Sequence, residues 1–200
     1  MFDVALRRLV DPALIRIAGL LADARISANT LSIGGAMLGL GAAFFITQSN
    51  FAAALVFIVL NRIVDGLDGA IARINGPTEF GGYLDTICDY IFYLAVPIAF
   101  GLIDPSNQLP ALLLVGSFTL TAVSFLAFAA IAARRAPDDN AFGQKAFIYS
   151  TGLMEGGETI AFFILFCLFP AFFPTLAIVF AVLCLLTVVQ RIVLAAKSFR

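Results

Sequence analysis

Four aspartates in an otherwise apolar part of the chain are the residues best suited to chemistry. Asp65 and Asp68 are three positions apart, and Asp85 and Asp89 are four apart. Side chains at these spacings share one face of a helix. A charged side chain in the middle of a membrane costs at least ~2.5–3.5 kcal/mol. We therefore expect the four carboxylates to face water, a cation or each other.

A short connection separates the two aspartate pairs, since only seven residues lie between Arg73 and Gly81. The helices on either side can then be antiparallel neighbours, which brings the four carboxylates to one depth. Oxygen-only ligands favour a hard cation, Mg²⁺ or Mn²⁺, and Mg²⁺ characteristically bridges carboxylates and substrate phosphates. Arg73 is a candidate phosphate or pyrophosphate ligand. Glycines that permit close approach crowd the same stretch: Gly66, Gly69, Gly76, Gly81 and Gly82.

The composition excludes a soluble globular domain, a disordered chain and a disulfide scaffold. Apolar residues make up 62% of the 200 residues and charged residues only 12%, against ~45–50% and ~25% in typical soluble chains. The chain has no histidine, which excludes a Cys/His zinc site. Its three cysteines, Cys88, Cys167 and Cys184, lie in apolar runs and are expected to be packing thiols. The basic residues form no nucleic-acid patch, so we expect no nucleic-acid partner.

The apolar pattern predicts an all-α membrane protein. A hydrocarbon core of ~30 Å needs ~20 apolar residues in a helix. Six stretches approach this length, and they predict six transmembrane helices: about 30–46, from 51 past 65, 82–103, 109–133, 147–169 and 172–196.

Residues 2–24 separate apolar from charged side chains, which predicts an N-terminal amphipathic interfacial helix before the six spans. The turns at 47–50, 104–108 and 170–174 contain no Lys or Arg, whereas the other connections and both ends hold the basic residues. Because positive residues stay cytoplasmic, we expect both termini and the aspartate cluster on the cytoplasmic side.

Residues 65–73 read D-G-L-D-G-A-I-A-R, and Gly81, Asp85 and Asp89 follow at intervals of four. This segment resembles the signature of the CDP-alcohol phosphotransferase (CDP-alcohol phosphatidyltransferase) family, D-x-x-D-G-x-x-A-R, a spacer, then G-x-x-x-D-x-x-x-D. Every fixed residue is present, and the spacer is one residue shorter than usual. The six-span pattern extends the resemblance over residues 1–200 as one membrane domain, with the motif 65–89 spanning the second and third transmembrane helices.

The resemblance implies metal-dependent transfer of a phosphatidyl (substituted phosphate) group from a CDP-linked lipid, such as CDP-diacylglycerol, to a polar acceptor alcohol, with release of CMP. It implies that one or two Mg²⁺ or Mn²⁺ ions bind to four ligands, Asp65, Asp68, Asp85 and Asp89. Asp89 would also be the catalytic general base. The residues implied to contact the CDP group are Asn29, Thr30, Gly69, Arg73 and Thr78. A homodimer among membrane lipids, in a bacterial inner (cytoplasmic) membrane, is also implied.

The acceptor is not identified by the sequence. Lys145, Arg191 and Arg135 are candidate acceptor ligands, because clustered cations suit a phosphorylated alcohol. They also fit simple positive-inside topology. Glu155 and Glu158 share one helical face, and they could pair with Lys145 or Arg62, or receive acceptor amines or hydroxyls.

Two other function classes fit parts of the pattern. An intramembrane ion or proton transporter also carries membrane carboxylates, although transporters often show internal repeats and midplane helix breaks, and this chain shows no repeat. A prenyltransferase-like enzyme also uses aspartates, metal and pyrophosphate, but such enzymes have more spans and more widely separated motifs. A structural scaffold leaves the four aspartates unexplained.

Overall fold

The computed structural model describes residues 14–135, 154 and 156–199, and the side chain of residue 135 is not among those described. These residues are almost entirely helical, with no strand among them. A short helix over 14–23 comes first. The helices that follow are α2 (Ala28–Thr47), α3 (Phe51–Asn75), α4 (Glu79–Ile103), α5 (Pro105–Arg135), α7 (Gly156–Leu168), the 3₁₀ turn η1 (Pro170–Phe172) and α8 (Phe173–Ser198).

Polar side chains set where the helices of the site begin. Ser27 Oγ accepts a hydrogen bond from the Thr30 N–H at 3.2 Å at the start of α2. Thr78 Oγ1 accepts one from the Gly81 N–H at 3.0 Å at the start of α4. Such caps satisfy backbone donors that the first turn leaves unpaired. Gly76, with φ of 89°, ends α3 in a conformation that favours glycine.

Asp104 alone connects α4 to α5. Its Oδ1 accepts hydrogen bonds from the Ser106 hydroxyl and the Ser106 N–H, both at 2.7 Å. These two bonds lower the pKa of the Asp104 carboxyl, because they stabilise its ionised form. The connection is therefore a tight turn that places α4 and α5 side by side.

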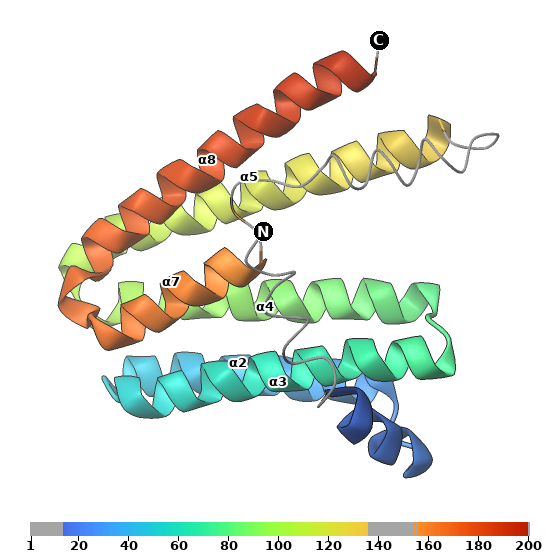
Figure 1. Ribbon diagram of the computed structural model, residues 1–200. Coiled ribbons are helices and arrows are strands. Elements are labelled where there is room, and N and C mark those ends of the chain that lie inside the picture. Colours follow the sequence, from blue (N-terminus) through green and yellow to red (C-terminus); the bar gives the residue numbers. More distant parts are fainter. Residues whose placement is uncertain (1–13, 136–153, 155, 200) are drawn as a thin grey trace.

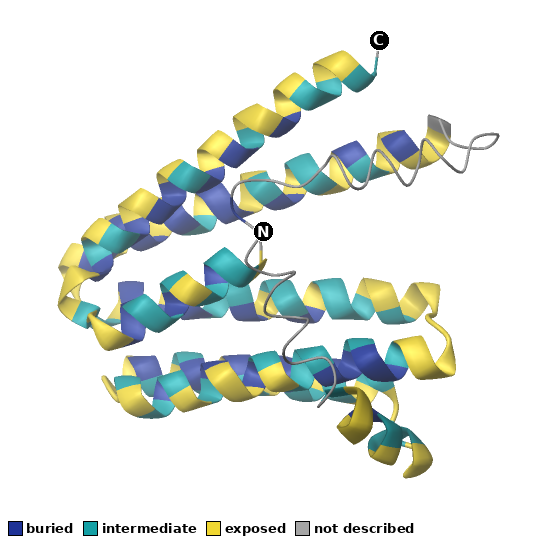
Figure 2. Ribbon diagram, viewed as in Figure 1, coloured by how far each residue is buried: buried dark blue, intermediate teal, exposed yellow. Residues whose placement is uncertain are grey.

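Helix α2 packs against both α3 and α4, and Figure 1 shows these three helices running alongside one another. Helices α5 and α8 form a second pair, which α4 joins through its contacts with α5. Figure 2 shows buried residues along the inner sides of the helices and exposed residues along the outer sides. The centre is a phenylalanine cluster in which every member is fully buried: Phe92, Phe100, Phe163, Phe166, Phe173 and Phe180.

Two glycines of α2 let its neighbours approach closely. A Cβ added at Gly39 would lie 2.8 Å from Cβ of Phe92 on α4, and one added at Gly41 would lie 2.6 Å from ring atoms of Phe57 on α3. Both distances are shorter than real carbon contacts. The spacing of α3 and α4 around α2, and hence of the carboxylates they carry, therefore depends on these two glycines.

The structure confirms the predicted all-helical class. Within the described residues, four helices are long and apolar enough to cross a membrane: Ala28–Thr47, Glu79–Ile103, Pro105–Arg134 and Pro170–Ser198. Helix α3 is not among them, and its 25 residues include four charged ones: Arg62, Asp65, Asp68 and Arg73. The described helix α7 has only 13 residues.

The predicted interfacial helix over 2–24 lies partly outside the described residues. Its described part, 14–23, packs on α3, where Ala18 is fully buried and a Cβ added at Gly66 would lie 2.8 Å from Cδ1 of Leu14. Ile15, Ile17 and Leu20 remain exposed. The short helix thus contacts the end of α3 that carries the aspartate motif.

Candidate active site

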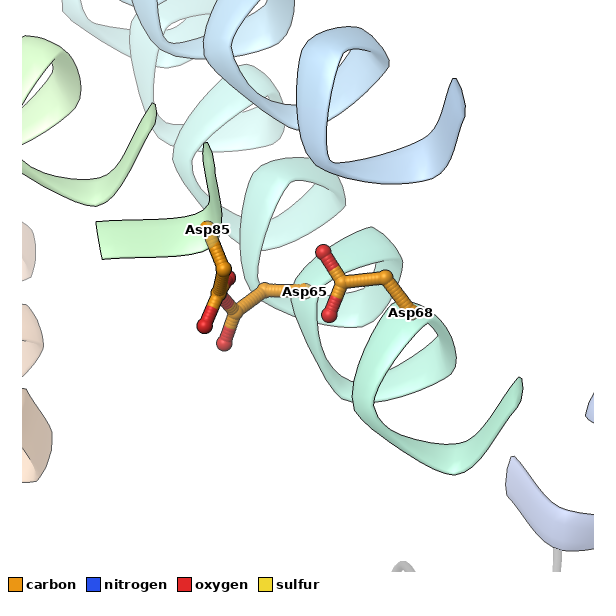
Figure 3. A group of neighbouring side chains, drawn as sticks. All are labelled: Asp65, Asp68 and Asp85. Atoms are coloured by element: carbon orange, nitrogen blue, oxygen red, sulfur yellow. The ribbon is translucent and has the colours of Figure 1, made fainter. Parts of the chain in front are cut away.

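Three of the four predicted aspartates meet between α3 and α4. Figure 3 shows the carboxyl groups of Asp65 and Asp68 from α3 and of Asp85 from α4 turned toward the same space. One carboxylate oxygen from each lies within 4.8 Å of the others. Hard divalent cations bind oxygens at ~2.0–2.6 Å, so one ion can contact ligand atoms ~4–5 Å apart. The donor set and its spacing therefore fit a divalent cation.

Asp68 is the most buried of the three, with only 5% of the residue exposed. Its Oδ2 accepts a hydrogen bond of 2.8 Å from the hydroxyl of Ser32 on α2, which is also buried. A buried ionised carboxylate needs such partners. Helix α2 therefore fixes the carboxylate of Asp68 through one side chain.

Asp89 has a different partner. Its Oδ1 accepts a hydrogen bond of 3.0 Å from Nη2 of Arg62, one helix away on α3. Nη1 of the same guanidinium lies 3.4 Å from Oδ2 of Asp65. Arg62 therefore connects the three-carboxylate group to Asp89.

The Arg62 guanidinium is held from several sides. Its Nε donates to Oδ1 of Asn61 at 2.7 Å, and Nδ2 of Asn61 donates to the Gly35 carbonyl of α2 at 2.7 Å. The guanidinium carbon lies 5.0 Å from the ring centroid of Phe92 and 5.7 Å from that of Tyr93, distances at which cation–π attraction operates. These contacts give the cation one defined position.

Two hollows adjoin the carboxylates. The walls of the small one include all four aspartates, together with Ser32, Asn61 and Cys88 among others. A larger one of about 350 Å³ lies beyond Asp68 and Asp85, between the start of α2 and the α3–α4 turn. Because Asp68 and Asp85 line both, a ligand in the larger pocket can reach a metal held by the carboxylates.

Most of the residues predicted to contact CDP lie at this larger pocket. Asn29, Gly69 and Thr78 line it. Arg73 does not line the pocket, but its Nη1 lies 3.5 Å from the position of a Cβ added at Gly69. Thr30 does not line the pocket, and its hydroxyl lies 2.9 Å from Ser27 Oγ at the helix cap.

Gly81 provides the close approach between two of these residues. A Cβ at Gly81 would lie 2.9 Å from Thr78 Oγ1 and 3.2 Å from Asn29 Oδ1. The glycine of the motif therefore lets α4 start directly against α2, with two polar side chains at the pocket wall.

The predicted acceptor residues are only partly described. Lys145 and Glu155 lie outside the described residues, as does the side chain of Arg135. Arg191 is buried on α8, where its Nη1 donates to the Thr121 carbonyl of α5 at 2.8 Å, and its guanidinium lies 5.3 Å from the Phe125 ring centroid. Arg191 thus joins α5 to α8, and it lines neither of the two hollows at the aspartates.

The sequence pattern does not predict the contacts that Ser32 and Asn61 make in the site, and it offers Arg62 only as a partner for the glutamates. A signal for Asn61 and Arg62 is present, because they precede Asp65 by four and three positions and so share its helical face. Ser32 carries no such signal, since its contact with Asp68 joins two helices.

Comparison with known proteins identifies the family of the chain. Residues 25–197 match the CDP-alcohol phosphatidyltransferase family, so the chain belongs to that family and is an enzyme of that class. It is 42% identical to the inner membrane protein YnjF of Escherichia coli (strain K12) over 193 residues, which cover 96% of this chain and 94% of YnjF. It is 35% identical over 85 residues to the archaetidylinositol phosphate synthase of Pyrococcus horikoshii, covering 42% of this chain and 45% of that protein.

The fold is similar to crystal structures of the phosphatidylinositol phosphate synthase PgsA1 of Mycobacterium tuberculosis. The complex with manganese and citrate aligns with a TM-score of 0.70 at 20% identity, covering 90% of this chain and 87% of that one. The structure with CDP-DAG bound aligns with a TM-score of 0.65 at 22% identity, covering 90% and 91%. At this identity the likeness concerns the fold.

Proposed function

We propose that the chain transfers a phosphatidyl group from a CDP-linked lipid, such as CDP-diacylglycerol, to a polar acceptor alcohol and releases CMP. The observation that carries this proposal is the convergence of Asp65, Asp68 and Asp85 beside the 350 Å³ pocket that Asn29, Gly69 and Thr78 line. A pyrophosphate joins a nucleotide to a lipid, so its binding site must combine a carboxylate-held cation with an adjoining nucleotide pocket.

We propose Asp65, Asp68 and Asp85 as ligands for Mg²⁺ or Mn²⁺. When bound, such an ion neutralises pyrophosphate charge and improves CMP as a leaving group. Arg73, whose guanidinium lies beside Gly69 of the pocket wall, adds a positive charge for the phosphates. Asn29 and Thr78 supply polar groups to the nucleotide from the wall that Gly81 brings together.

Asp89 is the proposed general base. Its carboxylate takes the proton of the acceptor hydroxyl while the hydroxyl oxygen bonds to the β-phosphorus of the CDP-lipid. The bond from that phosphorus to the oxygen of CMP breaks, and CMP leaves. The 28% exposed side chain of Asp89 leaves room for an acceptor to reach it from the cytoplasmic side.

We propose that each chain folds as one six-span domain over residues 1–200 and that two chains form a homodimer in a bacterial inner membrane. The N-terminal helix then lies in the membrane–water interface, and both termini and the site are on the cytoplasmic side. The absence of Lys and Arg from the turns at 47–50, 104–108 and 170–174 supports this orientation. A site at the cytoplasmic ends of membrane helices can bind the lipid donor from the bilayer and the polar acceptor from water.

Lys145, Arg191 and Arg135 remain the proposed acceptor ligands. Their charge favours a phosphorylated alcohol. The archaetidylinositol phosphate synthase among the relatives supports including inositol phosphate in the acceptor panel.

The test is CMP release by purified protein in detergent with CDP-diacylglycerol and Mg²⁺ or Mn²⁺. The acceptor panel is glycerol 3-phosphate, inositol phosphate, inositol, serine and choline. We expect CMP that depends on one acceptor, and its loss in Asp89→Asn and Asp85→Asn. The matched control is Asp104→Asn, which changes an aspartate in the turn between α4 and α5 and should keep activity.

An absence of CMP with every acceptor, from folded protein that binds Mn²⁺, would reject CDP-diacylglycerol as donor. CMP formation that survives Asp89→Asn would reject Asp89 as the base.

A further inference from the structure

Arg62 stands outside the aspartate signature, which begins at Asp65, yet it lies at the centre of the site. One guanidinium contacts Asp89 at 3.0 Å and Asp65 at 3.4 Å. Only 20% of the Arg62 side chain is exposed, so solvent screens these contacts less than those of a surface ion pair.

The four aspartates fall into two groups around this cation. One group brings carboxylate oxygens within 4.8 Å of one another and consists of Asp65, Asp68 and Asp85. Within the described part of the chain, Asp89 is not a member of this group. Its Oδ1 is directed to Nη2 of Arg62 instead. The positive charge beside Asp89 is thus supplied by the protein.

Resting on the proposed function, we infer that Arg62 is a positioning residue that takes the place of a second metal ion. It neutralises Asp89, holds this carboxylate apart from the three metal ligands, and limits each chain to one divalent ion. Asp89 then stays available to the acceptor hydroxyl.

The surroundings of Arg62 explain why a metal ion would not displace it. Its Nε is tied through Asn61 to the α2 backbone, since Asn61 Nδ2 donates to the Gly35 carbonyl. The rings of Phe92 and Tyr93 flank the guanidinium. The planar fork of arginine is suited to two carboxylates at once, whereas a lysine offers a single point charge. A second divalent ion next to Asp89 would also meet the repulsion of this fixed charge.

The direct test counts Mn²⁺ ions on purified, detergent-solubilised protein without substrate, by electron paramagnetic resonance of the free ion during titration. We expect one saturable site per chain in the natural protein and two in Arg62→Gln, because the substitution frees Asp89 and one oxygen of Asp65. Arg62→Lys keeps the charge and should retain one site. Lys197→Gln, which neutralises an exposed cation at the end of α8, is the control and should also retain one.

Asp89→Asn provides a second measurement that does not depend on how Arg62 variants fold. If Asp89 is not a metal ligand, Asp89→Asn keeps one site with an unchanged Mn²⁺ dissociation constant, whereas Asp85→Asn weakens it. Activity gives a further readout. Arg62→Gln should lower kcat by about 10²-fold with little change in the KM of the CDP-lipid, and Arg62→Lys should recover part of this loss.

The outcomes separate this inference from the proposed function. Two Mn²⁺ ions per natural chain, or loss of Mn²⁺ binding in Asp89→Asn, would overturn the role of Arg62 and leave the metal-dependent transfer intact. Failure of the natural protein to bind Mn²⁺ at all would overturn both.

Discussion

Removal of the Ser32 hydroxyl should weaken metal binding without touching a metal ligand. Ser32 Oγ donates to Asp68 Oδ2 at 2.8 Å, and only 6% of Ser32 and 5% of Asp68 are exposed. Ser32→Ala removes this hydrogen bond, which stabilises the charged form of the carboxylate. The ionised form that binds metal is therefore destabilised.

The size of the effect follows from this one contact. A hydrogen bond to a charged group contributes ~1.5–3 kcal/mol, and each ~1.4 kcal/mol corresponds to a factor of ten. Ser32→Ala should therefore raise the Mn²⁺ dissociation constant by about 10- to 100-fold, the range seen when outer partners of metal ligands are removed.

The assay measures Mn²⁺ binding to purified protein, together with the Mn²⁺ concentration that gives half-maximal CMP release. The control is Ser117→Ala, which removes another buried serine hydroxyl, one that donates to the Leu114 carbonyl within α5 at 2.7 Å. An unchanged Mn²⁺ affinity in Ser32→Ala, or an equal loss in Ser117→Ala, would refute the reasoning.

Three further predictions concern packing and the pocket wall. Gly39→Ala should lower the free energy of unfolding by ~1–3 kcal/mol, because the added Cβ lies 2.8 Å from Phe92. The control Gly34→Ala should not destabilise the protein, because its added Cβ has no neighbour within 4 Å. Thermal unfolding in detergent compares the two variants. Gly81→Ala should raise the KM of the CDP-lipid roughly tenfold, because the added Cβ displaces polar groups of the pocket wall. Steady-state kinetics at saturating acceptor measure this KM, and an unchanged value would contradict the prediction. Arg191→Gln should destabilise by ~1–3 kcal/mol because it removes the hydrogen bond by which a buried cation of α8 joins the Thr121 carbonyl of α5, and unchanged thermal unfolding would contradict the structural part of its role.

The convergence of the aspartates could be predicted because it depends on local rules. Helical periodicity places Asp65 beside Asp68 and Asp85 beside Asp89, and the short α3–α4 turn limits how far the pairs can separate. The structure brings Asp65, Asp68 and Asp85 within 4.8 Å. The roles assigned to them as ligands stay predictions.

The partners of the aspartates could not be predicted, because they depend on how three helices pack. Periodicity places Arg62 on the face of Asp65, but it does not reveal that the guanidinium reaches across to Asp89 on α4. The bond from Ser32 to Asp68 likewise depends on the depth at which α2 lies against α3. That depth is set by contacts between helices, such as Phe57 of α3 against Gly41 of α2. The residue pattern of a single helix does not specify which residues of its neighbour it will contact.

The fold shows the same division. Apolar length predicted the helices of 28–47, 79–103, 105–135 and 173–198 to within a few residues, with the largest difference at the start of 105–135, which was predicted at 109. The prediction succeeds because each helix must satisfy its own backbone in an apolar medium. The packing of α2 against both α3 and α4 was not predictable. It follows from glycine contacts and from aromatic packing such as the stacked rings of Phe100 and Phe173, whose centroids are 4.6 Å apart.

The most direct test of the central claim compares CMP with the lipid formed in the same reaction. Purified protein is incubated with CDP-diacylglycerol, Mn²⁺ and the acceptor panel, and CMP and phospholipid are quantified by mass spectrometry. Phosphatidyl transfer predicts one acceptor-linked phospholipid for each CMP, and neither product in Asp89→Asn. CMP accompanied by phosphatidic acid in place of an acceptor-linked lipid would contradict the account, because water and not an alcohol would then be the acceptor.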